Sequence, residues 1–161
     1  MNAILINMYI GGPPSFSCYK TTSHHSESKI HYTDCTVTTP GMDPASGVFK
    51  VQEPGVYQFT FTGFFVSLKG HMVSTDIYLR RGKDDKIIGR GSAKSEENGT
   101  FGLGTGTDDN LHSTISIVLQ ERLQLDDQVL VSMVIHGDHG SSKIDSDFSR
   151  KIIFTGLKIS D

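Results

Sequence analysis

The sequence predicts an all-β fold in which antiparallel strands form a sandwich or a barrel. In several segments, apolar and polar residues alternate with a period of two, which places the apolar side chains on one face of each predicted strand. Turn residues separate these segments, the chain contains 17 glycines, and no segment has a helical period. Strands that recur between turn signals in this way are typical of sandwiches and barrels.

The most informative pair of strands lies within residues 45–65, on either side of a turn at Pro54 and Gly55. In the second strand, aromatic residues alternate with small polar ones. The aromatic residues are Tyr57, Phe59, Phe61 and Phe65, and the polar residues are Gln58, Thr60 and Thr62. This pattern is typical of a half-buried antiparallel strand, and we expect Tyr57, Phe59 and Phe61 to form the centre of the core.

Two further segments predict a hairpin. Residues 73–80 alternate between apolar and polar types, which indicates a strand with one solvent-facing side. Residues 81–85 then form a charged turn, and residues 86–93 resume as a strand that glycine interrupts. A similar alternation at residues 114–123 predicts another strand.

The strand predicted at residues 129–135 differs from the others because both of its faces are apolar. One face carries Val129, Val131 and Met133, and the other carries Leu130 and Val134. Such a strand has more apolar surface than one sandwich covers, so we expect the second sheet to cover one side and a neighbouring subunit to cover the other. Either face could meet the neighbour.

Composition limits the classes of function that this chain can have. A chain of 161 residues can bury one core, and we expect one globular domain at residues 14–161, preceded by an extension or stalk remnant at residues 1–13. The formal net charge is −3 and the basic residues are scattered, which argues against nucleic-acid binding. No segment approaches the roughly 20 apolar residues that span a bilayer, so we expect no membrane insertion.

The sequence motifs of these segments resemble those of the globular-head family of complement C1q. In that family, a short strand ending in G-x-F is followed by a turn, by G-x-Y-x-F and by a long aromatic strand. The matching residues here are Gly47, Phe49, Gly55, Tyr57 and Phe59. Residues 16–21 are similar to the family's opening strand. The penultimate hairpin matches at Leu123, Asp127 and Val129, and the closing strand matches at Phe154, Gly156 and Leu157. Asp126 stands where the family commonly has glycine.

The resemblance implies a C1q/TNF-like fold, a jelly-roll sandwich of about ten antiparallel strands that is shared with the tumour-necrosis-factor superfamily. It also implies a secreted homotrimer without enzymatic activity, which binds an extracellular protein or polysaccharide ligand multivalently, as in innate-immune pattern recognition. Two alternatives stay open, because one fold hosts many functions. One is a cytokine-like or synaptic-organiser-like ligand for a receptor, and the other is a structural trimerisation head.

Exposed, rigid or charged residues are the candidates for ligand contact. They are Tyr78, Arg80, Arg81, Lys83 and Arg90. The alternative interpretation of these residues is an ordinary solvated face. No catalytic motif of the G-x-S-x-G or H-E-x-x-H type occurs in the sequence, so we expect no enzymatic activity.

Cys18 and Cys35 are the only cysteines in the chain. In the secreted protein that the resemblance implies, they are expected to form a disulfide, which would close a loop of about 16 residues and contribute roughly 3 kcal/mol. The alternative is a pair of buried free thiols. Asn98 begins an Asn-Gly-Thr acceptor sequence, so it is a candidate for glycosylation in an extracellular protein.

Two acidic loops are candidates for a metal, although no cofactor is required for the expected function. Some members of the C1q family bind calcium through acidic residues near the trimer axis, and Asp108 and Asp109 lie in the corresponding region. The alternative is a flexible glycine-rich loop at residues 99–110. Residues 136–147 combine histidines with aspartates and could bind zinc or calcium, or could form a solvated loop.

Overall fold

The computed structural model describes residues 12–24, 28–38, 40–68, 72–94, 110–136, 143–145 and 152–161. These residues form eleven strands and no helix. The strands are β1 (Ser15–Lys20), β2 (Asp34–Thr38), β3 (Met42–Asp43), β4 (Val48–Lys50), β5 (Gly55–Leu68), β6 (Met72–Arg81), β7 (Asp84–Lys94), β8 (Asn110–Leu123), β9 (Gln128–His136), β10 (Lys143–Asp145) and β11 (Ile152–Ser160). Within the described ranges there is accordingly no helix long and apolar enough to cross a membrane.

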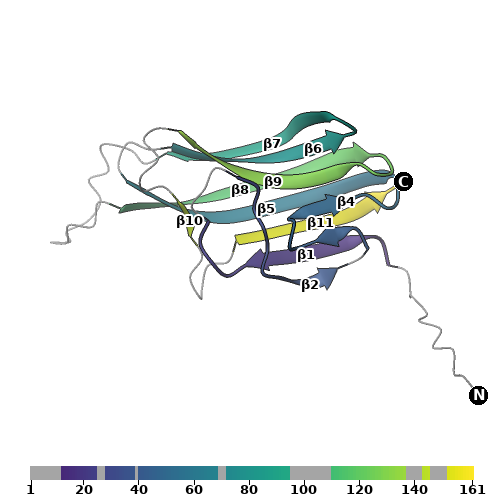
Figure 1. Ribbon diagram of the computed structural model, residues 1–161, viewed down its shortest axis with the longest axis horizontal. Helices are drawn as coiled ribbons and strands as arrows, with labels where there is room; N and C mark the ends of the chain where they lie inside the picture. The colour runs from purple at the N-terminus through teal and green to yellow at the C-terminus, as the bar shows by residue number, and fades with distance from the viewer. Residues whose placement is uncertain are drawn as a thin grey trace, which may run out of the picture.

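The strands form two antiparallel sheets, whose strands run along the long axis of the molecule (Figure 1). Sheet A has the order β8-β5-β11-β1-β2, and sheet B has the order β3-β4-β9-β6-β7. The short strand β10 pairs with residues 64–66 of β5, whereas β11 pairs with residues 56–62 on the same side of β5. Because β10 and β11 follow one another along a single edge of β5, each sheet has five strand positions. The expected sandwich of about ten antiparallel strands is therefore confirmed.

The period of two in β5 places its aromatic side chains in the core, as the sequence predicts. Tyr57, Phe59 and Phe61 are fully buried. The ring of Phe59 lies 5.9 Å from that of Phe154 in β11 and 6.2 Å from that of Phe49 in β4, centroid to centroid. This cluster joins strands of both sheets, so it is the apolar centre that holds the sandwich together.

Gly156 in β11 lets an aromatic ring approach the sheet closely. A Cβ atom at this position would lie only 2.3 Å from Cε1 of Phe16, a distance that no real contact allows. The ring of Phe16 in turn lies 4.9 Å from Phe49 and 5.1 Å from Phe154. The glycine in the closing strand is therefore explained by packing, because any side chain would displace Phe16 from the core.

The structure corrects the expectation for β9. Val129, Val131 and Met133 face the core of the same chain and are almost completely buried there, so this face cannot meet a neighbouring subunit. Leu130, on the opposite face, is only 6% exposed, because it lies between its cross-strand neighbours Val48 and Tyr78. The described chain thus covers Leu130 and the core-facing side of β9 itself. Val134 is partly exposed, so a subunit contact at that residue stays a prediction.

Candidate functional site

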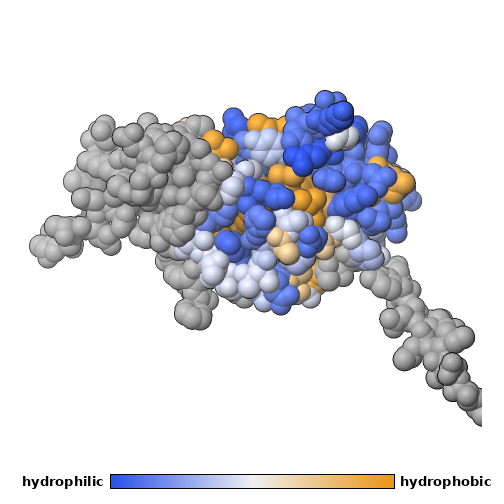
Figure 2. All heavy atoms as spheres, viewed as in Figure 1, coloured by the Kyte–Doolittle hydropathy of each residue, from blue (hydrophilic) through white to orange (hydrophobic). Residues whose placement is uncertain are grey.

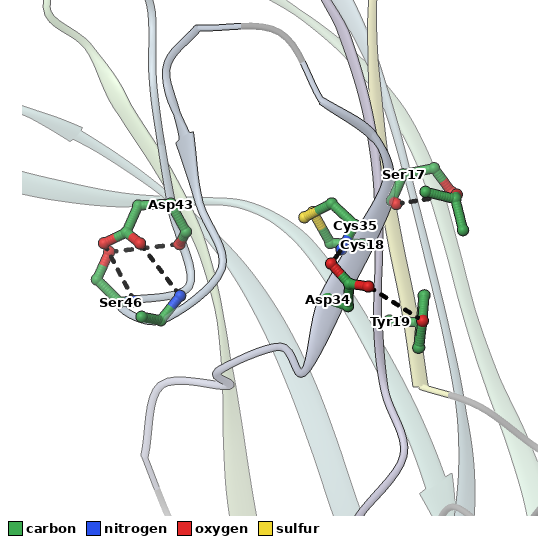
Figure 3. The surroundings of a disulfide bond; sticks show 9 residues. Ser17, Cys18, Tyr19, Asp34, Cys35, Asp43 and Ser46 are labelled. Atoms are coloured by element: carbon green, nitrogen blue, oxygen red, sulfur yellow. Dashed lines mark hydrogen bonds between the residues drawn. A yellow bond between two sulfur atoms is a disulfide. The ribbon is translucent and has the colours of Figure 1, made fainter.

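A disulfide between Cys18 and Cys35 joins β1 to the edge strand β2, which confirms the predicted pairing (Figure 3). Cys18 is completely buried in the core. Asp34 lies beside the bridge, where its carboxylate accepts a hydrogen bond of 2.8 Å from the backbone N–H of Cys35 and one of 3.5 Å from the hydroxyl of Tyr19. Cross-linking residues that are 17 positions apart stabilises a protein by about 3 kcal/mol in the chain-entropy account.

The residues predicted to contact a ligand lie on and around the β6–β7 hairpin of sheet B. Tyr78, Arg80 and Arg90 share its outer face, opposite the core-facing side chains of β6. Arg81 lies at the end of β6 and points to the β8–β9 turn, whereas Lys83 is exposed in the β6–β7 turn. Figure 2 shows strongly hydrophilic residues gathered at the end of the molecule that carries this hairpin turn. The structure therefore brings three of the five residues together.

Each of the three arginines is engaged by a carboxylate through two parallel hydrogen bonds. Arg80 binds Asp85 at 2.7 and 2.8 Å, Arg81 binds Asp127 at 2.9 and 2.6 Å, and Arg90 binds Asp76 at 2.6 and 2.7 Å. The hydrogen bonds from Arg80 and Arg81 hold the pKa values of Asp85 and Asp127 below their ordinary range. Because every guanidinium has an internal counterion, this surface is not the strongly basic patch that the arginines alone suggest.

Asp76 anchors Arg90 on the outer surface of sheet B. Its side chain is fully buried although it points away from the core, because the Arg90 guanidinium covers it and the Tyr78 hydroxyl lies 3.4 Å from its Oδ2 atom. Burial also raises the pKa of Tyr78, and the neighbouring carboxylate adds to the effect. A buried carboxylate needs such partners, so Asp76 fixes the orientation of Arg90 rather than serving as a free ligand group.

The outer face of sheet A has the opposite character, and we call its central part the uncharged face. Three rows of paired residues cross the sheet there. The rows are Val37, Ser17, Thr155, Thr60 and Val118; Ser15, Leu157, Gln58 and Gln120; and Tyr19, Ile153, Thr62 and Ser116. None of these residues carries a charge, and the charged Asp34, which pairs with Tyr19 on the edge strand β2, borders the face. Val118 is 66% exposed, and Val37, Ile153 and Leu157 are between 37% and 49% exposed.

The sequence analysis missed this face. β11 carries apolar residues on both sides. Ile152 and Phe154 are buried on the core side, whereas Ile153 and Leu157 are exposed on the outer side. β11, rather than the strand at residues 129–135, leaves apolar side chains exposed on its outer side. Exposed apolar side chains on a flat, uncharged sheet favour association with another protein surface. We therefore regard the uncharged face, rather than β9, as the candidate interface.

Comparison with solved structures places this architecture among known folds. The globular domain of zebrafish complement 1qA protein matches with a TM-score of 0.64 and 16% identity, over 92% of this chain and 98% of that chain. Murine APRIL matches with a TM-score of 0.66 and 9% identity, over 92% of this chain and all of that chain. The chain has a C1q/TNF-like fold. No family model and no curated protein sequence matches it.

The other predicted sites of this C1q/TNF-like domain are only partly described. Asp108 and Asp109, which were expected to bind calcium, and Asn98, which was expected to carry a glycan, lie outside the described residues. So does most of the predicted metal loop at residues 136–147. Among the residues that are described, no group of three histidine, cysteine or acidic side chains could hold a metal ion.

Proposed function

We propose that this protein is a secreted, non-enzymatic recognition domain that assembles as a homotrimer and binds an extracellular protein or polysaccharide. The observation that carries the proposal is the uncharged face of sheet A, where Val118 and Leu157 leave apolar surface in water. The C1q/TNF-like fold supports it, because domains of this fold typically form trimers. The disulfide supports the extracellular location, because such bonds persist in oxidising compartments.

The edge of sheet A also favours self-association. β8 is an edge strand with no charged residue between Ser113 and Gln120, whereas the edge strand β7 of sheet B carries Lys86 and Arg90. Charges on an edge strand discourage further pairing, and β8 has none over this stretch. A face and an edge on one subunit can form a heterologous contact, in which each subunit presents its edge to the face of the next. Such contacts close into a ring after three copies.

Trimerisation supplies the mechanism of recognition. Three weak sites that are held rigidly together gain affinity through effective concentration, so a repetitive ligand can be held without one strong pocket. Tyr78 and Arg90, on the outer face of sheet B, and Lys83, in the β6–β7 turn, are the proposed ligand contacts, since all three lie away from the uncharged face. Because Arg90 is paired, we expect it to contact the ligand through hydrogen bonds and stacking rather than as a free charge.

Calcium is a further part of the proposal. In a symmetric trimer, Asp108 and Asp109 of three subunits would approach the axis, where their carboxylates would repel one another unless a cation lay between them. Adding a chelator is expected to lower the stability of the trimer. A trimer that melts at the same temperature with and without a chelator would remove calcium from the proposal and leave the rest.

A receptor ligand is the second candidate function, because the fit to murine APRIL is as good as the fit to the complement domain. The experiment that decides is binding of the purified protein to microbial polysaccharides and to a panel of receptor ectodomains, each immobilised at high and low density. We expect slow dissociation from dense polysaccharide and fast dissociation from sparse polysaccharide. Binding to one receptor at either density would favour the receptor ligand, and binding to neither surface would favour a structural trimerisation head.

A further inference from the structure

A pocket of about 680 Å³ lies at the end of the sandwich where β5 begins. Its walls come from both sheets. They include Glu53, Gly55, Arg81, Arg122, Lys158 and Asp161. Ligand sites in proteins commonly have volumes of about 300 to 1,000 Å³ and lie at the mouths of β-barrels and between packed layers. We call this cavity the end pocket. It lies apart from the ligand contacts proposed for sheet B, except that Arg81 lines it.

The backbone at Gly55 positions a lysine in the end pocket. A Cβ atom on Gly55 would lie 2.5 Å from Cε of Lys158 and 2.5 Å from the carbonyl oxygen of Ser160. Because glycine has no Cβ atom, the Lys158 stem can lie across this position, where its side chain is only 12% exposed. Gly55 therefore allows an ammonium group to be held at the wall of the pocket by packing of its stem.

Two cations of the pocket hold the acidic residue Asp161. Lys158 Nζ lies 2.6 Å from Oδ1 of Asp161 and 3.5 Å from Oε2 of Glu53. Arg122 donates a hydrogen bond of 3.2 Å from Nη2 to the main-chain oxygen of Asp161. The ion pair with Asp161 raises the pKa of Lys158, so the ammonium stays charged at neutral pH. One aspartate thus offers its side-chain carboxylate to the lysine and its main-chain oxygen to the arginine.

The charge of the pocket depends on whether Asp161 occupies it. Arg81 already forms a salt bridge with Asp127. Without Asp161, the three cations Arg81, Arg122 and Lys158 face the two carboxylates of Asp127 and Glu53, which leaves one net positive charge. The Asp161 side chain is fully exposed, so few other contacts hold it in the pocket. An incoming acidic residue could replace it without uncovering buried surface.

We propose that the end pocket binds an acidic peptide segment of a partner protein, with Asp161 as a built-in competitor. The partner's aspartate or glutamate carboxylate takes the place of the Asp161 carboxylate on Lys158, and its main-chain carbonyl accepts the hydrogen bond from Arg122. Asp161 itself shows that the two cations are spaced to receive the side-chain carboxylate and the main-chain oxygen of one amino-acid residue. An acidic saccharide offers carboxylates or sulfates but lacks this pairing with the main-chain oxygen of the same residue.

The test is a titration of the purified protein with the blocked dipeptide acetyl-Asp-Asp-amide, followed by NMR or calorimetry. Acetyl-Asn-Asn-amide is the matched neutral probe. The acidic dipeptide is expected to bind and the neutral one is not. The Asp161→Asn variant should bind the acidic dipeptide about two- to fivefold more tightly, the range that release from an exposed ion pair allows. Rising salt should weaken binding in both proteins.

Three variants connect binding to the two cations. Arg122→Gln and Lys158→Gln should each weaken binding of the acidic dipeptide, whereas Arg80→Gln, which removes an arginine paired with Asp85 outside the pocket, should leave it unchanged. Arg122 is exposed, so its substitution tests the site even if the lysine variant fails to fold. Equal binding of the two dipeptides, or unchanged binding in Arg122→Gln, would overturn the proposal. Binding of a sulfated disaccharide in place of the acidic dipeptide would overturn it too.

Discussion

Phe59 is the residue on which the core depends most. It lies against the rings of Phe16, Phe49, Tyr57 and Phe154 and is fully buried. We expect Phe59→Ala to lower the free energy of unfolding by about 3 to 5 kcal/mol, because transfer energy is lost and a cavity remains. Chemical denaturation measures this loss, with Ile87→Ala, at an exposed residue of sheet B, as the control. A Phe59→Ala midpoint close to that of the parent would contradict the assignment of the core.

Asp126 tests a backbone requirement at the β8–β9 turn. Its φ angle is 68°, in the left-handed region that favours glycine, and its carboxylate forms an exposed ion pair with Lys50 at 2.8 Å. Asp126→Gly and Asp126→Ala both remove that ion pair, so their difference in unfolding free energy isolates the backbone. We expect the glycine variant to be more stable than the alanine variant by about 1 kcal/mol. Equal midpoints in denaturant would show that the turn carries no such strain.

Asp127 makes stability depend on pH. Hydrogen bonds from Arg81 and from the backbone N–H of Gln124 lower its pKa in the folded state. The stabilisation is therefore present above the ordinary carboxyl pKa of about 4 and is lost as the pH falls through the lower folded value. We expect parent and Asp127→Asn to differ in unfolding free energy at pH 7 and to converge toward pH 2. A difference that stays constant over this range would contradict the proposed ion pair.

At the scale of elements, the disulfide is expected to hold the edge strand β2 on sheet A. β2 pairs only with β1 among the described strands, so its ordering depends on few neighbours. Replacing both Cys18 and Cys35 by alanine should cost about 3 kcal/mol and raise amide hydrogen exchange in β2 more than in β5. Mass spectrometry of the unreduced parent provides the control. Uniform exchange in the two strands of the variant would show that the bridge does not hold β2 locally.

The elements themselves were largely predictable from the sequence, but the covering of their faces was not. The period of two predicts the strands β5 and β6 and the core-facing side of β9. Such alternation can be recognised from residues that are neighbours in the sequence. Whether Leu130 is covered depends on Val48 and Tyr78, which come from strands distant in sequence. The same limit applies to the arginines. Their exposure follows from their type, but the pairing of Arg81 with Asp127 joins residues 46 positions apart.

At the scale of the whole molecule, the two sheets present unlike outer faces. Sheet B presents paired charges, such as Arg90 with Asp76, which suit a solvent-facing surface that meets a ligand. Sheet A presents the uncharged face, which suits contact with another subunit. In the proposed trimer, this division would separate an inner surface from an outer one. The proposed recognition and the proposed assembly would then use different surfaces of the domain.

Sedimentation of the purified protein at micromolar concentration tests the trimer most directly. We expect the parent to have three times the 17.6 kDa mass of the chain. Val118→Glu places a carboxylate on the uncharged face and should dissociate the trimer, because burying an unpaired charge is costly. Ile87→Glu, an equally drastic change at an exposed apolar residue on the outer face of sheet B, should remain trimeric. A monomeric parent, or dissociation by Ile87→Glu with Val118→Glu still trimeric, would contradict assembly through the uncharged face.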